Sequence, residues 1–330
     1  MVQHAPSLNC GGVIHGSLQQ LDGENVTLNG GFEMSGDLLV PGTPTVAVYG
    51  HPFYAGTVPG DGSSSPSGYK VILDGNCSFR YLRTRTTPVT LPIVSRPPTP
   101  TGTRTVTITR PGQSIGNPDT LRNLTLAGRA GFISLPPGTY GNVTVDDCSG
   151  LVIGVAGAVQ PTIYNLQNLT LNGFSTLKVA SPVILTVANG FTVNGWLGDR
   201  KNPTWLQLNI ASGNLTLNCG AVVYGQIAAP SGRVTIGTGS TLVGTSASAN
   251  FVLNGYGHVR WSGEAQTVVA PVATNQTITL AENGSTSIAL TGSDPENLPL
   301  TYSVLTQPAH GVLSGTPPNL NYRPATNFSG

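Results

Sequence analysis

Acidic side chains are the first candidates for chemistry in this sequence, and they are scarce. Between Leu124 and Phe251 they are Asp146, Asp147 and Asp199 alone. Cleavage of a sugar chain needs acidic groups close together, as a general acid and base or as a calcium site beside a basic group. Asp146 and Asp147 are neighbours, so in a strand their side chains point apart. The pattern favours a protein that is not an enzyme; if it is one, these three aspartates are the catalytic candidates.

The residues best suited to ligand binding lie in one short segment, GWLGDRKNPTW at 195–205. This segment contains two of the three tryptophans and the densest charge of its region. Exposed aromatic rings combine apolar area with a polar edge, which suits sugar stacking or protein docking. Alternatively, both rings fold over the wall of the domain. The candidate ligand-binding residues are Trp196, Asp199, Arg200, Lys201 and Trp205.

The sequence contains none of the common metal-binding or nucleophile motifs. The four cysteines contain no CxxC pair of the kind that indicates zinc, and no Gly-rich phosphate loop, GxSxG turn or HExxH helix occurs. We therefore expect no cofactor at these positions. The histidines show no ligand spacing and are expected in surface turns: His4, His15, His51, His258 and His310.

Composition describes the elements that must position these side chains. Only 9% of the 330 residues are charged, and 43 glycines and 26 prolines interrupt almost every stretch. Long helices are therefore unfavourable, whereas 38% hydrophobic residues can still bury a core, so the chain is predicted to be all-β. A net charge of +1 with scattered basic residues argues against nucleic-acid binding. No apolar run is long enough for a membrane span, and we expect that an export signal has been removed.

A short motif, apolar-Thr-apolar-Asn-Gly, recurs along the chain. Between residues 124 and 251 its copies start 19, 26, 22, 24, 19 and 17 residues apart, which is the length of one solenoid coil. The two apolar residues of each copy point inward, and stacked coils pair every strand with its neighbours at about 4.8 Å. The sequence thus predicts a parallel β-helix, expected to be right-handed. Copies start at Val26, Ile72, Val106, Leu124, Val143, Leu169, Phe191, Leu215, Val234 and Phe251.

Asparagine and glycine after each strand are expected at the corners of the coils. Asn can form a ladder there, and Gly supplies a positive φ. Several copies also spell the glycosylation pattern Asn-X-Thr, which we interpret as a by-product of an Asn before a Thr-rich strand. The corner residues are Asn172, Asn194, Asn218 and Asn254, and the Asn-X-Thr positions are Asn123, Asn142, Asn168 and Asn214.

Coil counting also bears on the cysteines. Cys148 and Cys219 lie three coils apart, about 14 Å, which is beyond the reach of a disulfide. They are expected to be unpaired. Cys10 and Cys77 could form a bridge near the N-terminal end.

The chain divides into four parts by composition and by the regularity of the repeat. Residues 1–104 read as an N-terminal cap and irregular coils with long Pro/Gly/Ser-rich loops, because an open solenoid end must be covered. Regular coils fill 105–261, a linker follows at 262–270, and residues 271–330 have a different texture.

Residues 271–330 resemble the bacterial Ig-like and cadherin-like tandem modules of secreted surface proteins. The resemblance rests on the GSDPENLPLTYSV turn and strand, the HGVLSG hairpin and the NLNYRPATNFSG segment. It implies an incomplete Ig-like β-sandwich, which a longer chain or a strand from another subunit would complete. In such modules acidic residues of the turn can bind calcium, which here implies Asp294, Glu296 and Asn297.

Residues 105–261, with LPPGTYGNVTV and AAPSGRVTIGTGSTLVG, are similar to Gly/Asn-rich solenoid domains of secreted or pilus-associated bacterial proteins. Together the two resemblances imply an extracellular or cell-surface structural or adhesion protein. Its expected partners are an extracellular polysaccharide, bound by the solenoid face, or a surface or matrix protein. Two alternatives remain open: a polysaccharide lyase or glycoside hydrolase, and a self-associating filament or fibre subunit completed by strand exchange.

Overall fold

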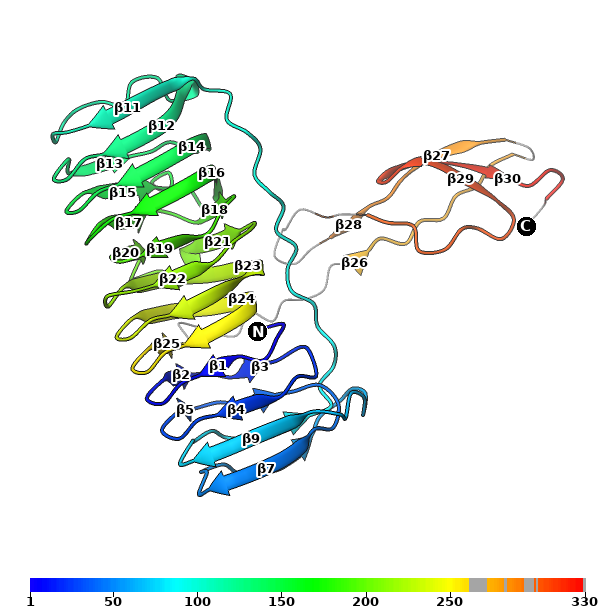
Figure 1. The fold of residues 1–330 in the computed structure, drawn as a ribbon. Coiled ribbons are helices and arrows are strands. Elements are labelled where there is room, and N and C mark those ends of the chain that lie inside the picture. The colour runs from blue at the N-terminus through cyan, green and yellow to red at the C-terminus, as the bar shows by residue number, and fades with distance from the viewer. Residues whose placement is uncertain (261–271, 282–283, 294–299, 301, 329–330) are drawn as a thin grey trace. The chain divides into compact units, whose positions relative to one another are not determined.

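The computed structural model describes residues 1–260, 272–281, 284–293, 300 and 302–328. The chain forms two compact units, Met1–Gly263 and Glu264–Gly330. The described residues form strands and irregular connections with almost no helix, as the composition predicts, and the first unit is a parallel β-solenoid (Figure 1).

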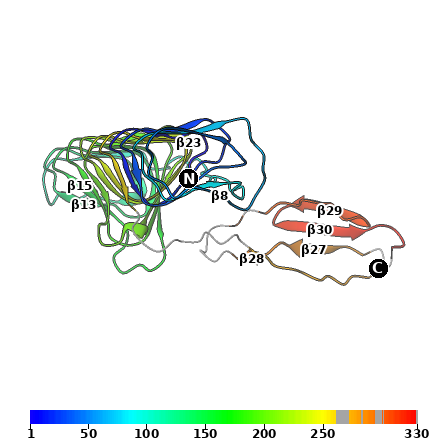
Figure 2. The same cartoon turned by 90° about the horizontal axis from the view of Figure 1, so that it is seen from below.

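The solenoid has three faces, each a column of parallel strands (Figure 2). Face 1 carries the recurring apolar-Thr-apolar motif. It consists of β1 (Ser7–Leu8), β4 (Val26–Leu28), β7 (Thr45–Gly50), β9 (Lys70–Gly75), β11 (Arg104–Ile108), β12 (Leu121–Leu126), β19 (Phe191–Val193), β22 (Leu215–Leu217) and the C-terminal parts of β14 (Gly138–Val145), β16 (Thr162–Leu171), β23 (Val222–Ile236) and β24 (Thr241–Leu253).

Face 2 follows face 1 in each coil, and face 3 completes the coil. Face 2 consists of β2 (Val13–His15), β5 (Glu33–Met34), β13 (Phe132–Ser134), β15 (Gly150–Ile153), β17 (Thr176–Val179), β20 (Trp196–Gly198), β25 (His258–Arg260) and the first residues of β23 and β24. Face 3 consists of β3 (Leu18–Gln19), β6 (Leu38–Leu39), β8 (Thr57–Pro59), β10 (Leu82–Thr84), β18 (Val183–Val187), β21 (Leu206–Ile210) and the remaining parts of β14, β16, β23 and β24. Two short 3-10 helices lie between strands, η1 (Pro118–Thr120) and η2 (Pro203–Trp205).

The register of face 1 confirms the predicted ladder. Leu124 pairs with Val143, Val143 with Leu169, and Leu215 with Phe191. These inward side chains are almost fully buried and form one continuous core. Between them the threonines point outward and stack in one column: Thr107, Thr125, Thr144, Thr170, Thr192, Thr216 and Thr235.

The corner between faces 1 and 2 is a four-residue turn in most coils. At the predicted corner position the N–H of Ser175 donates to the carbonyl of Asn172, and that of Gly257 donates to Asn254. Asn9 donates to Asn254 across neighbouring coils, as expected for an amide ladder. A second ladder runs along the Asn-X-Thr positions, where Asn168 donates to Asn142. The amides of that pattern thus have a structural role, which supports the by-product interpretation.

The coils do not stack in the order of the sequence. The regular coils run from β11 to β25, and β25 then pairs with β2, while β24 pairs with β1. Val2 forms a parallel β-bridge with Ser248 on face 3. Val2 therefore supplies face 3 of the coil whose strands on faces 1 and 2 lie in residues 251–260. Residues 1–84, part of the segment predicted as an N-terminal cap and irregular coils, therefore form coils that extend the solenoid beyond residue 260.

One of these N-terminal coils lies between two coils that both precede it in the sequence. Strand β9 pairs with β4 on one side and β7 on the other, and β10 likewise lies between β6 and β8. The coil of residues 69–84 thus separates the coil of residues 22–40 from that of residues 45–59, which forms the end of the stack.

A strap, residues 85–103, connects this inserted coil to β11 at the opposite end of the solenoid (Figure 1). It must pass ten coil steps, about 48 Å. Nineteen residues in a polyproline conformation span about 59 Å, so the Pro-rich sequence is long enough. Pro97 and Pro100 are buried, and Gln167 of β16 donates to the carbonyl of Pro98 at 2.7 Å. The strap therefore packs along the solenoid.

The strands described in the second unit all pair antiparallel. A three-stranded sheet has the order β27 (Thr286–Ala289), β30 (Asn319–Pro324), β29 (Gly311–Thr316), and a separate pair joins β26 (Val272–Ala273) to β28 (Gly292–Ser293). Strand β29 and its partner β30 form the hairpin predicted from HGVLSG. Leu320 is the buried apolar residue among those described in this unit.

Candidate functional site

The three aspartates considered for catalysis lie at two different corners. Asp146 and Asp147 occupy the turn between faces 1 and 2, where Asp146 accepts a bond from Asn172 and Asp147 accepts one from the N–H of Phe174. Asp199 follows β20 at the corner that leads to face 3 and accepts two bonds from Asn202. The structure thus gives each carboxylate a turn-stabilising role and does not bring Asp199 to the other two.

The predicted binding segment separates its two tryptophans. Trp196 begins β20 and points outward, with 62% of its surface exposed. Trp205 ends η2 and packs partly buried against the core, as the alternative interpretation describes. Arg200 and Lys201 are exposed in the loop between them, and Asp199 holds the same loop. Of this set, Trp196 is the aromatic ring available to a ligand.

Trp196 belongs to a larger group that the sequence did not single out. Every aromatic side chain that is exposed in the described solenoid lies at the corner between faces 1 and 2 or at the first residues beyond it. We call this group the aromatic corner. Its members are Tyr49, Phe53, Phe132, Phe174, Trp196 and Tyr256.

Strand register places the aromatic corner along the solenoid. Phe132 lies three coils before Trp196, and the turn of Phe174 lies in the coil between them that is adjacent to Trp196. The coil of Tyr256 follows three coils after Trp196, and Phe53 lies four coils further. Ten coil steps separate the first and last of these rings, about 48 Å.

Glycines allow two of the rings to lie close to the backbone. A side chain at Gly150 would meet the ring of Phe132 at 2.3 Å, so this ring covers Gly150. The ring of Tyr256 similarly covers Gly11, where a Cβ would lie 3.5 Å from Cε1. Each ring therefore rests on one side and presents area to solvent on the other. Flat, exposed aromatic rings of this kind can stack on an apolar ligand surface.

A local sequence signal for three of these rings exists. Phe174, Trp196 and Tyr256 each follow an Asn-Gly dipeptide directly, in the strings LNGF, VNGW and LNGY. The dipeptide marks the corner, so an aromatic residue after it must lie on the outside of the turn or at the start of face 2. Phe132 and Phe53 are not preceded by an Asn-Gly dipeptide, so this signal does not find them.

All four cysteines are free. Cys148 and Cys219 are exposed at corner turns, in agreement with the coil count. The suggested bridge between Cys10 and Cys77 does not form, because Cys77 points into the core and Cys10 lies exposed two coils away. Burial raises the pKa of the Cys77 thiol, which makes it unreactive.

The calcium prediction for Asp294, Glu296 and Asn297 falls outside the described residues. Among the described helices, none has the length and apolarity that crossing a membrane requires.

Comparisons with known proteins concern the second unit. No curated protein and no solved structure shows detectable similarity to the chain. The family model of the bacterial Ig domain matches residues 269–330. The chain therefore consists of a β-solenoid followed by a bacterial Ig domain.

Proposed function

We propose that the solenoid binds an extracellular polysaccharide along the aromatic corner, as part of a secreted or surface-displayed adhesion protein. The combination of a solenoid with a bacterial Ig domain fits a surface or adhesion-type protein. The observation that supports the finer proposal is the gathering of all exposed aromatic rings of the described solenoid at one corner.

The physical argument rests on the shape of the ligand. A sugar ring has a face of C–H groups that packs on an aromatic ring, and hydroxyl groups at its rim that stay in water. A polysaccharide repeats this unit at regular intervals, as the coils repeat their corner. A single exposed ring gives weak binding, but several rings on one rigid support add their contributions without further loss of freedom.

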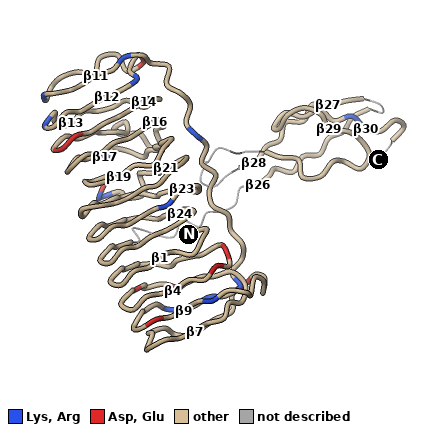
Figure 3. Tube along the Cα trace, viewed as in Figure 1, with Lys and Arg blue, Asp and Glu red and all other residues tan. Residues whose placement is uncertain are grey.

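The sparse charge of the solenoid indicates which polysaccharides fit. Lys, Arg, Asp and Glu are few and scattered along its coils (Figure 3). No basic stripe is present among the described residues to neutralise an acidic polymer. We therefore expect an uncharged polysaccharide, with binding that changes little between low and moderate salt.

Retention on a panel of insoluble and gel-embedded polysaccharides tests the proposal. The intact chain should be retained by at least one uncharged polymer. The double variant Phe174→Ala/Trp196→Ala should lose roughly tenfold or more of this affinity, which corresponds to about 0.7 kcal/mol or more for each ring.

Ile163→Ala is the matched control, because Ile163 is also a large exposed apolar residue but lies on face 3. It should bind as the unaltered chain does. Retention on no polysaccharide, or equal retention of the double variant, would show that the aromatic corner is not a sugar-binding surface. Capture of a matrix protein through the same rings would assign the corner to protein docking instead.

A further inference from the structure

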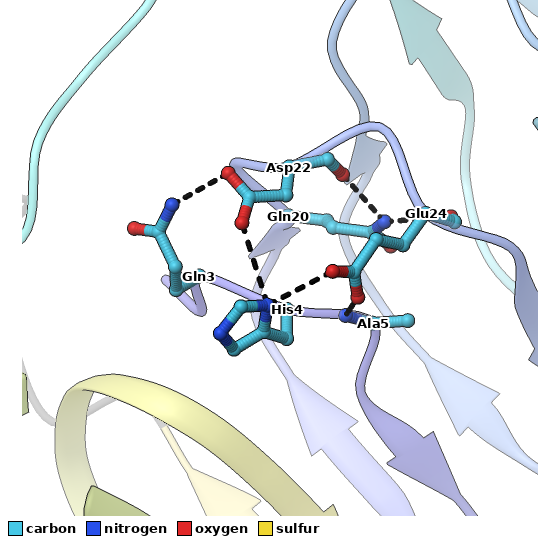
Figure 4. Close-up of polar contacts among 6 residues, drawn as sticks. All are labelled: Gln3, His4, Ala5, Gln20, Asp22 and Glu24. Carbon is cyan, nitrogen blue, oxygen red and sulfur yellow. Dashed lines mark hydrogen bonds and ion pairs between the residues drawn. The ribbon is translucent and has the colours of Figure 1, made fainter. Parts of the chain in front are cut away.

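Another corner of the solenoid, between faces 3 and 1, brings together three groups that can bind metal (Figure 4). His4 lies before β1, and Asp22 and Glu24 lie one coil further, between β3 and β4. The Nδ1 of His4 is 2.9 Å from Oε1 of Glu24 and 3.4 Å from Oδ2 of Asp22. The three ligand atoms all lie within 4.8 Å of one another.

Neighbouring groups orient both carboxylates. The side-chain amide of Gln3 donates to Oδ1 of Asp22, and the N–H of Ala5 donates to Oε2 of Glu24 at 3.0 Å. One oxygen of each carboxylate thereby accepts a hydrogen bond from a group outside the cluster, and the other oxygen faces the imidazole of His4. The bond from Ala5, and after it the bond from His4, keeps the pKa of Glu24 below its usual value, so this carboxylate is an anion at neutral pH.

A buried side chain fixes the loop that carries the two carboxylates. Gln20 is completely buried, and its amide nitrogen donates to the backbone carbonyls of Asp22 at 2.7 Å and Glu24 at 2.8 Å. Its own Oε1 has no hydrogen-bond partner. Burying an amide with an unpartnered oxygen is unfavourable. Charged side chains in water gain little stability when the loop that carries them is held in one conformation. A metal site gains affinity, because its ligands are already in place.

We propose that His4, Asp22 and Glu24 bind a divalent transition-metal ion, with zinc as the best match. Calcium and magnesium prefer oxygen ligands throughout, while an imidazole nitrogen with two carboxylates suits zinc and its neighbours. In a tetrahedral site with bonds of about 2.1 Å, ligand atoms lie about 3.4 Å apart. The His4–Asp22 separation of 3.4 Å matches this geometry, and the His4–Glu24 separation of 2.9 Å needs to open by about half an ångström.

The site would join two successive coils at the start of residues 1–84, the segment that extends the solenoid beyond residue 260. The N–H groups of Gln3 and His4 donate to the carbonyls of Ser248 and Ala249, so the ligand-bearing segment also forms the junction with the coil of residues 241–260. A bound ion stabilises the folded state by mass action, because the unfolded chain does not hold the three ligands together. The metal thus strengthens this junction, a role independent of sugar binding.

Zinc titration of the metal-free full-length chain, purified without a polyhistidine tag, tests the proposal. Calorimetry should show one ion per chain, and the melting temperature should rise with added zinc. His4→Ala and Glu24→Gln should each weaken binding at least tenfold and abolish the rise. His15→Ala and Glu33→Gln are matched controls, since both residues are exposed on face 2, and they should bind zinc normally.

Asp22→Asn serves as a third variant if His4→Ala does not fold, and circular dichroism checks the fold of each protein. The proposal is overturned if zinc neither binds nor raises the melting temperature. It is also overturned if the His4, Asp22 and Glu24 variants bind as well as the controls. Calcium binding as tight as zinc binding would contradict the assigned class of metal.

Discussion

At the scale of single residues, the position within a coil decides the role of a side chain. Leu215 and Leu217 are fully buried, while Thr216 between them points outward in the threonine column. This alternation, and the corner role of Asn before Gly, could be predicted from the recurring motif. The partnership of His4 with Asp22 and Glu24 could not be seen in local spacing, because one full coil separates the histidine from the acids.

Truncation of an inward leucine should be much more damaging than truncation of its outward neighbour. Leu215→Ala leaves a cavity in a close-packed core and should lower the free energy of unfolding by about 2–5 kcal/mol. Thr216→Ala, one residue away, should change it by less than about 1 kcal/mol. Urea unfolding followed by circular dichroism measures both. Similar losses for the two variants would contradict the inward–outward assignment.

At the scale of elements, a charged cluster fastens the inserted coil to its neighbour. Asp37, beside β6, is buried and accepts two bonds from Arg80 and one from Arg83, which lie in the coil of residues 69–84. Both guanidinium groups also lie within 6 Å of the ring of Tyr81, at 5.9 and 5.7 Å from its centroid. The motif predicted that β9 forms a coil, but not which coils it would lie between, because every strand of face 1 offers nearly the same apolar surface.

Acid should weaken this contact in a defined pH range. The bonds from Arg80, and with them those from Arg83, lower the pKa of Asp37 to about 2. A free aspartate titrates near 3.9, so the contribution of Asp37 to folding is present above that pH and is lost as the pH falls towards 2. Asp37→Asn should therefore destabilise the chain by up to about 2 kcal/mol at pH 7 and by much less at pH 2.

Urea unfolding across this pH range measures the difference between the two proteins. Asp61→Asn is the control, since Asp61 lies in the exposed loop after β8 and should behave as the unaltered chain does. A difference between Asp37→Asn and the unaltered chain that stays constant down to pH 2 would show that the carboxylate charge is not its source.

At the scale of the whole solenoid, spatial order and chain order differ. The coil begun by residues 251–260 is continued by residues 1–2, and the strap returns the chain from one end to the other. Coil formation follows from local periodicity and could be predicted. The stacking order depends on pairings between segments about 245 residues apart, such as Leu8 with Leu253, and no local pattern specifies them.

A permuted solenoid tests this order directly. A chain that runs from 104 to 260 and continues through a linker of about three residues into residues 1–84 needs no strap. Other coils connect face 2 to face 3 with equally short segments, as between β2 and β3. The permuted chain should give the same circular dichroism spectrum and a urea midpoint close to that of the original solenoid. Failure to fold would contradict the junction between residues 260 and 2.

The junction between residues 260 and 2 also delays completion of the fold during biosynthesis. The coil of β1 and β2 pairs on one side with β4 and β5 and on the other side with residues 241–260, which are made about 160 residues after residue 84. At 5–20 residues per second this delay is roughly 8–30 s. Throughout it the nascent N-terminal strands have an open edge on the side that will meet β24, and such edges attract other chains. A factor that shields early strands until translation is complete would therefore raise the yield of this protein more than that of a solenoid wound in chain order.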